Sequence, residues 1–281
     1  MKLLSFSAGG KQKFGAMDGE RVFDLSARLP AVADLRGLLA GGGFELAAAT
    51  LAGASADYGI ADIRFEPVIP RPAKILCIGL NYEDHVIETQ RTRTDHPTVF
   101  TRFADTQVGH EGNIIKPRHS NKVDFEAELA LVIGKPGRDI PAERALEHVA
   151  GFSCYNDVSI RDYQNHTTQF TPGKNFPGTG PFGPALVSPR DLGAIGPQRI
   201  QSRLNGQVMQ SATLGDMIFP VPALIAYLSQ WTRLDTGDVI ITGTPGGVGV
   251  KRNPRVFLKE GDEFEVEIDG VGLLRNRVVA E

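Results

Sequence analysis

Short runs of apolar and β-branched residues, separated by turn signals, dominate the chain after about residue 72, and this pattern predicts strands. The clearest runs lie at residues 75–78, 127–134, 152–155 and 240–241. Helical patterns are fewer and short, at residues 83–89, 142–148, 159–166 and 223–231. This part of the chain is therefore predicted to consist mainly of strands, with short helices inserted between them.

Two dipeptides predict tight hairpins. Asn205-Gly206 tolerates the positive φ angles at the two central positions of a type I′ turn. Asp269-Gly270 carries the same signal between predicted strands at residues 263–268 and 271–279. The chain has neither a Gly-rich phosphate loop nor a regular alternation of strands and helices, which argues against a nucleotide-binding fold.

The first sixty-odd residues have a different pattern. Strands are predicted near residues 2–7 and 21–25, followed by Ala- and Leu-rich helices on either side of residues 41–43. Pro67, Pro70 and Pro72 then interrupt regular structure, because a proline lacks the amide donor and restrains the residue before it. We therefore expect a small N-terminal module at residues 1–69 and a main domain at residues 70–281.

Composition narrows the possible partners. Of the 281 residues, 41% are apolar and 22% are charged, which is typical of a globular protein. The 30 basic and 33 acidic side chains leave a net charge of −3 without a long run of one sign, so neither nucleic acid nor an anionic membrane is expected to bind. A small molecule is the expected partner.

Cys77 and Cys154 are the only cysteines, and both lie in apolar runs where buried free thiols are expected. The first residues lack the apolar core of a secretion signal, and no apolar run approaches the roughly 20 residues that span a bilayer. We therefore expect a soluble, cytoplasmic protein.

Glu126 and Glu128 introduce the first candidate chemistry. Residues two apart in a strand project from the same face, so these carboxylates start about 7 Å apart at the backbone. In a buried strand their repulsion requires a cation, and hard oxygen ligands favour Mg²⁺, Mn²⁺ or Ca²⁺. Alternatively, this is a solvated edge strand whose outward residues are acidic, and spacing alone does not separate the two.

Asp157 stands where a predicted strand meets a predicted helix and offers a third carboxylate ligand. Three carboxylates would neutralise a divalent ion and leave coordination positions for water and substrate. The alternative is that Asp157 caps the helix by accepting hydrogen bonds from its first amides.

His85 and Glu88 share a face if residues 83–89 are helical, so the carboxylate can orient the imidazole as a general base. An ordinary surface ion pair would have the same spacing.

Lys174 lies in a Gly- and Pro-rich loop, where it either stabilises an anionic intermediate or is a surface lysine in a turn. Thr244 follows a β-branched strand in a loop whose hydroxyls and amides suit a carboxylate.

Taken together and in this order, these segments resemble the fumarylacetoacetate hydrolase family from about Lys74 to Val279. The resemblance implies that His85 and Glu88 activate water and that one Mg²⁺ or Mn²⁺ per subunit is held by Glu126, Glu128 and Asp157. It further implies a catalytic role for Lys174 and substrate binding by Arg161, Gln164 and Thr244. Many relatives have Phe-Leu-Lys-Pro where this chain has Phe100-Thr101-Arg102-Phe103. Arg102 thus stands at the position of the family's lysine, and we expect it to bind the substrate.

The resemblance also implies an α+β fold, a mixed β-sandwich roll with short helices, preceded by a small N-terminal α/β module and assembled as a homodimer. The expected activity is metal-dependent hydrolysis of a C–C bond in β-diketo acids of the acylpyruvate or fumarylpyruvate type, through a metal-bound enolate, as used in aromatic catabolism. An isomerase or decarboxylase acting on 2-hydroxymuconate-type diacids or oxaloacetate is the alternative within enzymes. A metal-stabilised binding protein without turnover is the alternative outside them.

Overall fold

The apolar run at Ala127–Ile133 forms the buried strand β11 at the centre of the main sheet in the computed structural model, which describes residues 1–281. Strands β12 (Val149–Asn156) and β17 (Val239–Ile241) flank it, both antiparallel to it. The sheet continues through β6 (Ile75–Gly79), which is parallel to β17, to β7 (Thr98–Arg102). On the other side β14 (Gly180–Val187) pairs with β12, and the short β8 (Gln107–Val108) pairs with β14.

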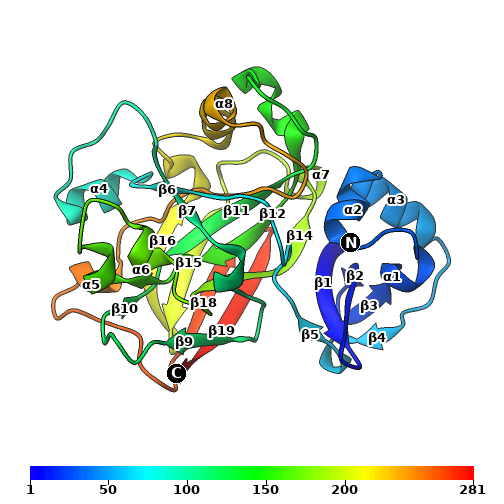
Figure 1. The fold of residues 1–281 in the computed structure, drawn as a ribbon, viewed down its shortest axis with the longest axis horizontal. Helices are drawn as coiled ribbons and strands as arrows, with labels where there is room; N and C mark the ends of the chain where they lie inside the picture. The colour runs from blue at the N-terminus through cyan, green and yellow to red at the C-terminus, as the bar shows by residue number, and fades with distance from the viewer.

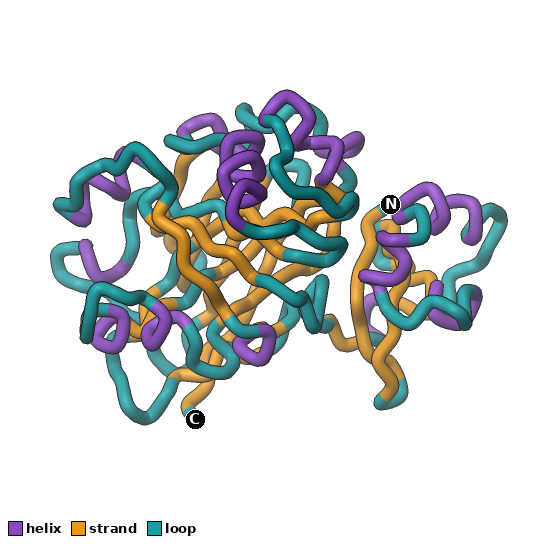
Figure 2. Tube along the Cα trace, turned by 45° about the horizontal axis from the view of Figure 1, so that its top comes forward, coloured by secondary structure: helices purple, strands orange, loops and turns teal.

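A second, five-stranded sheet packs against the first (Figure 1, Figure 2). Its strands, in spatial order, are β16 (Gln207–Thr213), β15 (Arg199–Leu204), β18 (Glu263–Ile268), β19 (Gly272–Ala280) and β9 (Asn113–Lys116). The two layers share a core of 36 buried apolar residues. Both predicted hairpins are present, and Asn205 and Gly206 have φ angles of 49° and 81°, as a type I′ turn requires. The expected α+β sandwich with short helices is confirmed.

The N-terminal residues form a smaller lobe beside the sandwich (Figure 1). It contains β1 (Lys2–Ala8), β2 (Lys11–Asp18), β3 (Arg21–Asp24), α1 (Leu25–Arg28), α2 (Leu35–Ala40), α3 (Gly43–Thr50), β4 (Tyr58–Gly59), η1 (Ile60–Asp62) and β5 (Arg64–Phe65). Strand β1 pairs with β14 at Leu3 and Leu186, so the two parts share one continuous sheet. Strand β2 was not predicted, because its polar first half carries no apolar alternation and only pairing along all of β1 makes it a strand.

Helices in the main part agree with the sequence pattern where their signals are local. Helix α4 (Glu83–Thr89) has the predicted bounds, and α8 (Val221–Trp231) begins two residues earlier than predicted. The predicted helix at residues 142–148 is the 3₁₀ helix η3 (Ala142–His148). The other short helices are η2 (Ala104–Thr106), α6 (Thr171–Lys174), α7 (Pro189–Leu192), η4 (Leu214–Asp216) and η5 (Gly249–Lys251).

The single helix predicted at residues 159–166 is wrong. Residues Ser159–Ile160 form strand β13, which pairs with β10 (Val123–Asp124), and only α5 (Arg161–Gln164) is helical. Pairing with a segment more than thirty residues away prevails over the local helical pattern.

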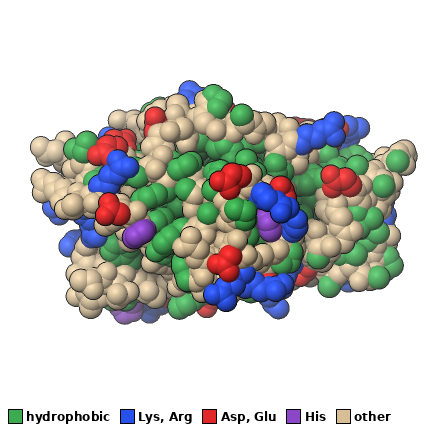
Figure 3. Space-filling view, turned by 90° about the horizontal axis from the view of Figure 1, so that it is seen from above, with side chains coloured by type: hydrophobic (Ala, Val, Ile, Leu, Met, Phe, Trp, Pro, Cys, Tyr) green, Lys and Arg blue, Asp and Glu red, His purple; other side chains and the backbone are tan.

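Cys77 and Cys154 are buried free thiols, as expected. None of the helices combines the length and the apolar composition that crossing a bilayer requires. In the face shown in Figure 3, acidic and basic side chains are interspersed, and no patch of one sign stands out.

A shared core predicts that a change in the N-terminal lobe destabilises the whole chain. Leu38 on α2 is fully buried in a cluster that also contains Val132 and Val239 of the main sheet. Leu38→Ala should lower the free energy of unfolding by about 2–5 kcal/mol, because it removes buried methyl groups and leaves a cavity. The measurement is urea unfolding followed by the fluorescence of Trp231, the only tryptophan. Because Trp231 lies on α8, outside the N-terminal lobe, its fluorescence reports the unfolding of the main part of the chain.

The matched control is Leu146→Ala, because the Leu146 side chain is 44% exposed and should change stability little. A Trp231 transition that Leu38→Ala leaves unmoved would mean that the lobe unfolds independently of the sandwich.

Candidate functional site

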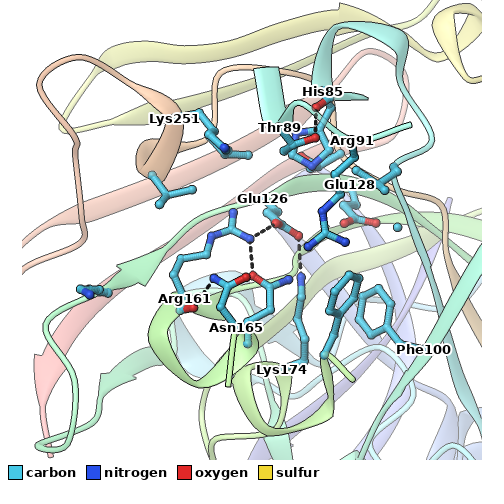
Figure 4. Close-up of a pocket in the computed structure, with 18 of the residues that line it drawn as sticks. His85, Thr89, Arg91, Phe100, Glu126, Glu128, Arg161, Asn165, Lys174 and Lys251 are labelled. Carbon is cyan, nitrogen blue, oxygen red and sulfur yellow. Dashed lines mark hydrogen bonds and ion pairs between the residues drawn. The ribbon is translucent and has the colours of Figure 1, made fainter. Parts of the chain in front are cut away.

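A cavity of about 440 Å³ opens where the β6–α4 segment, the start of β11, helices α5 and α6, and the loop after β17 meet (Figure 4). Most of the predicted site residues line it: His85, Glu126, Glu128, Arg161, Gln164, Lys174 and Thr244. Glu88 and Asp157 lie behind this lining and contact its members, and Arg102 lies behind Asp157. The fold thus brings together residues that are far apart in the sequence.

Three buried carboxylates, Glu126, Glu128 and Asp157, each place an oxygen within 4.8 Å of the others. Strand register explains this approach, because β11 and β12 pair through Ala127 and Asn156 and the Asp157 amide donates to the Glu126 carbonyl oxygen at 2.9 Å. The solvated edge strand is therefore wrong, since β11 lies between two other strands. The capping alternative for Asp157 is also wrong, because the next helix starts at Arg161 without a side-chain cap.

Two cations hold Glu126. Lys174 Nζ lies 2.6 Å from Glu126 Oε2 and 2.5 Å from Asp157 Oδ2, and Arg161 Nη1 lies 2.7 Å from Glu126 Oε1. Burial by itself would raise the pKa of Glu126, but the charges of Lys174 and Arg161 outweigh it and lower the pKa to about 2. Lys174 is thus a buried part of the cluster, and the surface-turn alternative is wrong.

Glu128 is the carboxylate of this group without an ion pair, and its one hydrogen bond is from the Gly243 amide at 2.5 Å. Burial, and then repulsion by Asp157 and Glu126, raise the pKa of Glu128 well above its usual range. Gly243 has a φ of 98°, and a Cβ there would lie 2.6 Å from the Asn81 Cβ, so only glycine brings this amide so close.

The charge balance of the cluster fits a divalent cation. Asp124, which pairs with Arg161 at 2.7 Å, adds a fourth carboxylate to the triad. With all four ionised, four negative charges would face three positive ones from Arg102, Arg161 and Lys174. A surplus buried negative charge is costly unless a cation compensates it. Carboxylate oxygens are the ligands that Mg²⁺ and Mn²⁺ prefer, so Glu126, Glu128 and Asp157 suit either ion.

Arg102 does not line the cavity, which corrects its assignment to substrate binding. Its side chain is fully buried, with Nη1 2.5 Å from Asp157 Oδ1 and Nη2 2.7 Å from Thr179 Oγ1. Because its charge lies behind Asp157, Arg102 fixes the orientation of that carboxylate and cannot reach a ligand in the cavity.

On α4 the buried His85 pairs with the half-buried Glu88, so the surface ion pair is wrong. His85 Nδ1 lies 2.7 Å from Glu88 Oε1, and Glu88 Oε2 accepts a hydrogen bond from the Gly247 amide at 2.9 Å. When Nδ1 carries the hydrogen that is donated to Glu88, the Nε2 lone pair of His85 is free to act as a base on the cavity side.

Arg161 offers the clearest contact for an anionic ligand. Its Nη2 is buried without a hydrogen-bond partner, whereas Nε binds Asp124 and Nη1 binds Glu126 and Gln164. The Thr244 hydroxyl is already engaged, because it donates to the Ala127 carbonyl oxygen and accepts from Gln210. Of the two, Arg161 is therefore the one with a side-chain donor to spare.

Sequence reasoning missed Asp124 and Gly243. Asp124 stands two residues before Glu126, but it belongs to β10, which ends before β11 begins, so only the tertiary structure brings it to the site. Nothing in the local sequence distinguishes Gly243 from the other glycines, because its role depends on the approach of Glu128 from another strand.

Comparisons with known proteins agree with this fold. The family model described as fumarylacetoacetate (FAA) hydrolase C-terminal matches residues 74–279. Mitochondrial oxaloacetate tautomerase FAHD2A of Bos taurus is 44% identical over 220 residues, covering 78% of this chain and 70% of that protein. The structure of fumarylacetoacetate hydrolase from the psychrophilic Exiguobacterium antarcticum matches with a TM-score of 0.84 and 32% identity over 100% of both chains.

Maleylpyruvate hydrolase from Sphingobium sp. SYK-6, solved in complex with manganese(II) and pyruvate, has the same fold. Its TM-score is 0.84 at 24% identity, covering 100% of this chain and 99% of that one.

Glu128→Gln should abolish metal binding and stabilise the metal-free protein. Glutamine keeps an acceptor for the Gly243 amide but removes the charge that Asp157 and Glu126 repel. In calorimetric melting, the metal-free variant should unfold about 2–4 °C above the metal-free wild type. Added Mn²⁺ should raise the melting temperature of the wild type, because it binds the native state, and leave that of the variant unchanged.

Glu260→Gln is the matched control, since Glu260 is exposed and its carboxylate is not in the cavity. Equal stabilisation of the wild type and Glu128→Gln by Mn²⁺ would contradict the assignment of this carboxylate as a ligand.

Proposed function

Because the chain belongs to the fumarylacetoacetate hydrolase family, we propose that this enzyme interconverts the keto and enol forms of a 2-oxo diacid. The reaction would require Mg²⁺ or Mn²⁺. Oxaloacetate is the first substrate to test. The observation that carries the proposal is a base, His85, facing the same cavity as a buried carboxylate triad and an unpartnered guanidinium nitrogen of Arg161. The relatives named as oxaloacetate tautomerases support this choice of reaction.

The 2-oxo acid end of the substrate has its partners at the bottom of the cavity. A divalent cation held by Glu126, Glu128 and Asp157 would polarise the keto and carboxylate oxygens of the 2-oxo acid. Arg161 Nη2 binds the carboxylate and fixes the position of the carbon that loses its proton.

His85 Nε2 takes the proton from the carbon next to the keto group and returns it at the oxygen, which completes the keto-to-enol conversion. Glu88 keeps the imidazole in the required orientation. The buried Lys174 ammonium supplies positive charge near the oxygens on which negative charge develops.

Hydrolysis of a β-diketo acid is the second candidate, and the dyad favours it. Glu88 fixes His85 as a base that can deprotonate a water molecule, and the cavity of about 440 Å³ has room for both a water and an acyl chain. The products would be pyruvate and a carboxylic acid. A homodimer in the cytoplasm, as expected from the sequence, stays a prediction that the size of the purified protein and its location in the cell would test.

Proton transfer at the carbon next to the keto group is measured by deuterium uptake into oxaloacetate and by decay of its enol absorbance. The enzyme with Mn²⁺ should accelerate both, and EDTA should abolish the acceleration. His85→Ala should lower the rate about 10²-fold or more, because the base is lost. The matched control is His119→Ala, which removes an exposed imidazole that is not part of the cavity lining and should leave the rate unchanged.

Full activity of His85→Ala on oxaloacetate would overturn the assignment of the base. Release of pyruvate and an acid from an acylpyruvate, without acceleration of oxaloacetate enolisation, would favour the hydrolase instead.

A further inference from the structure

Basic side chains line the mouth of the cavity without acidic partners. Lys122, Lys251 and Arg255 are exposed, belong to the cavity lining and form none of the ion pairs of the structure. Arg91 is a fourth lining cation, but its guanidinium stacks over the Phe170 ring with the two centres 5.1 Å apart. The one carboxylate at this level, Asp162, accepts hydrogen bonds from the Ser120 hydroxyl. The mouth therefore carries an excess of positive charge.

The loop that carries Lys251 and Arg255 is held firmly to the site. Asp124, which binds Arg161, also accepts hydrogen bonds from the amides of Gly249 and Val250 at 2.8 and 3.0 Å. Arg252 turns away from the cavity and donates to the carbonyl oxygens of Gly247 and Met209. The two neighbouring cations, Lys251 and Arg255, line the cavity instead. Figure 4 shows Lys251 on the side opposite Phe100.

Lys122 joins this group through the backbone. Its carbonyl oxygen accepts a hydrogen bond from the Arg161 amide at 3.0 Å, so Lys122 is tied to the residue that binds the inner carboxylate. Apolar side chains, Ile78, Phe100, Phe170, Val248 and Val250, line the same cavity. The acidic triad and the free Arg161 donor at the bottom, the apolar walls and the cationic mouth match an elongated 2-oxo acid with a second negative charge at its far end.

We propose that Lys122, Lys251 and Arg255 bind a second carboxylate at the far end of the substrate, so that the enzyme selects extended 2-oxo diacids over 2-oxo monoacids of the same length. The inference rests on the proposed function, because it takes the 2-oxo acid end to lie at the triad. It adds the residues that recognise the distal end. A cavity of about 440 Å³ also exceeds the need of a four-carbon diacid, which favours a longer carbon chain.

Equilibrium binding of two 2-oxo acids tests the distal site independently of the rate of turnover. The diacid 2-oxohexanedioate and the monoacid 2-oxohexanoate have equal chain length and differ in a terminal carboxylate or methyl group. Titration calorimetry with the Mn²⁺-loaded protein should show that the diacid binds about tenfold tighter or better. This preference should shrink as ionic strength rises, because the cations are exposed.

The double variant K251Q/R255Q should reduce the preference to less than about twofold, with unchanged affinity for the monoacid. Lys259→Gln is the control, because it removes one exposed charge from the same segment without touching the cavity lining, and it should preserve the preference. Equal binding of both ligands to the wild type, or a preference that survives in K251Q/R255Q, would overturn the inference. Failure of both ligands to bind would instead contradict the proposed function, since it places any 2-oxo acid at the triad.

Discussion

The surplus of buried negative charge at Glu126, Glu128 and Asp157 is the constraint on which the rest of the site depends. Two of these carboxylates have cationic partners in the chain, whereas Glu128 has only a backbone amide. Burying such a group is unfavourable, and the fold accepts it because β11 and β12 bring it to a place that a divalent cation would neutralise. In the metal-free chain this burial costs stability, which a bound cation would restore.

The cations around the triad have separate tasks that follow from their depth. Arg102 is completely buried and holds Asp157 from behind. Lys174 bridges Glu126 and Asp157 and borders the cavity. Arg161 links Asp124 and Glu126 and still has one nitrogen free for a ligand. Together these three cations compensate most of the charge of the four buried carboxylates. Only Arg161 keeps a free donor, which is available to an anionic ligand.

The two ends of the cavity carry opposite charge. The proposed reaction depends on the charge at the bottom, and the proposed substrate selectivity depends on the charge at the mouth. Negative charge at the bottom suits a cation and the oxygens that it polarises, whereas positive charge at the mouth suits a distal anion. The dyad of His85 and Glu88 stands to one side, held by the Gly247 amide in the loop that leads on to Lys251 and Arg255. One loop therefore supports the base and also carries two of the cations at the mouth.

The sequence by itself determined the features that depend on neighbours along the chain. The pairing of His85 with Glu88 and the turn at Asn205-Gly206 follow from helix and turn geometry, and the motif order identified the family. Only the tertiary structure decided what depends on contacts between distant segments. It made Ser159 and Ile160 a strand through pairing with Val123 and Asp124, and it placed Arg102 behind Asp157. The physical reason is that hydrogen bonds and charge pairs across the sheets outweigh weak local preferences, and no local pattern records which distant partner a side chain will meet.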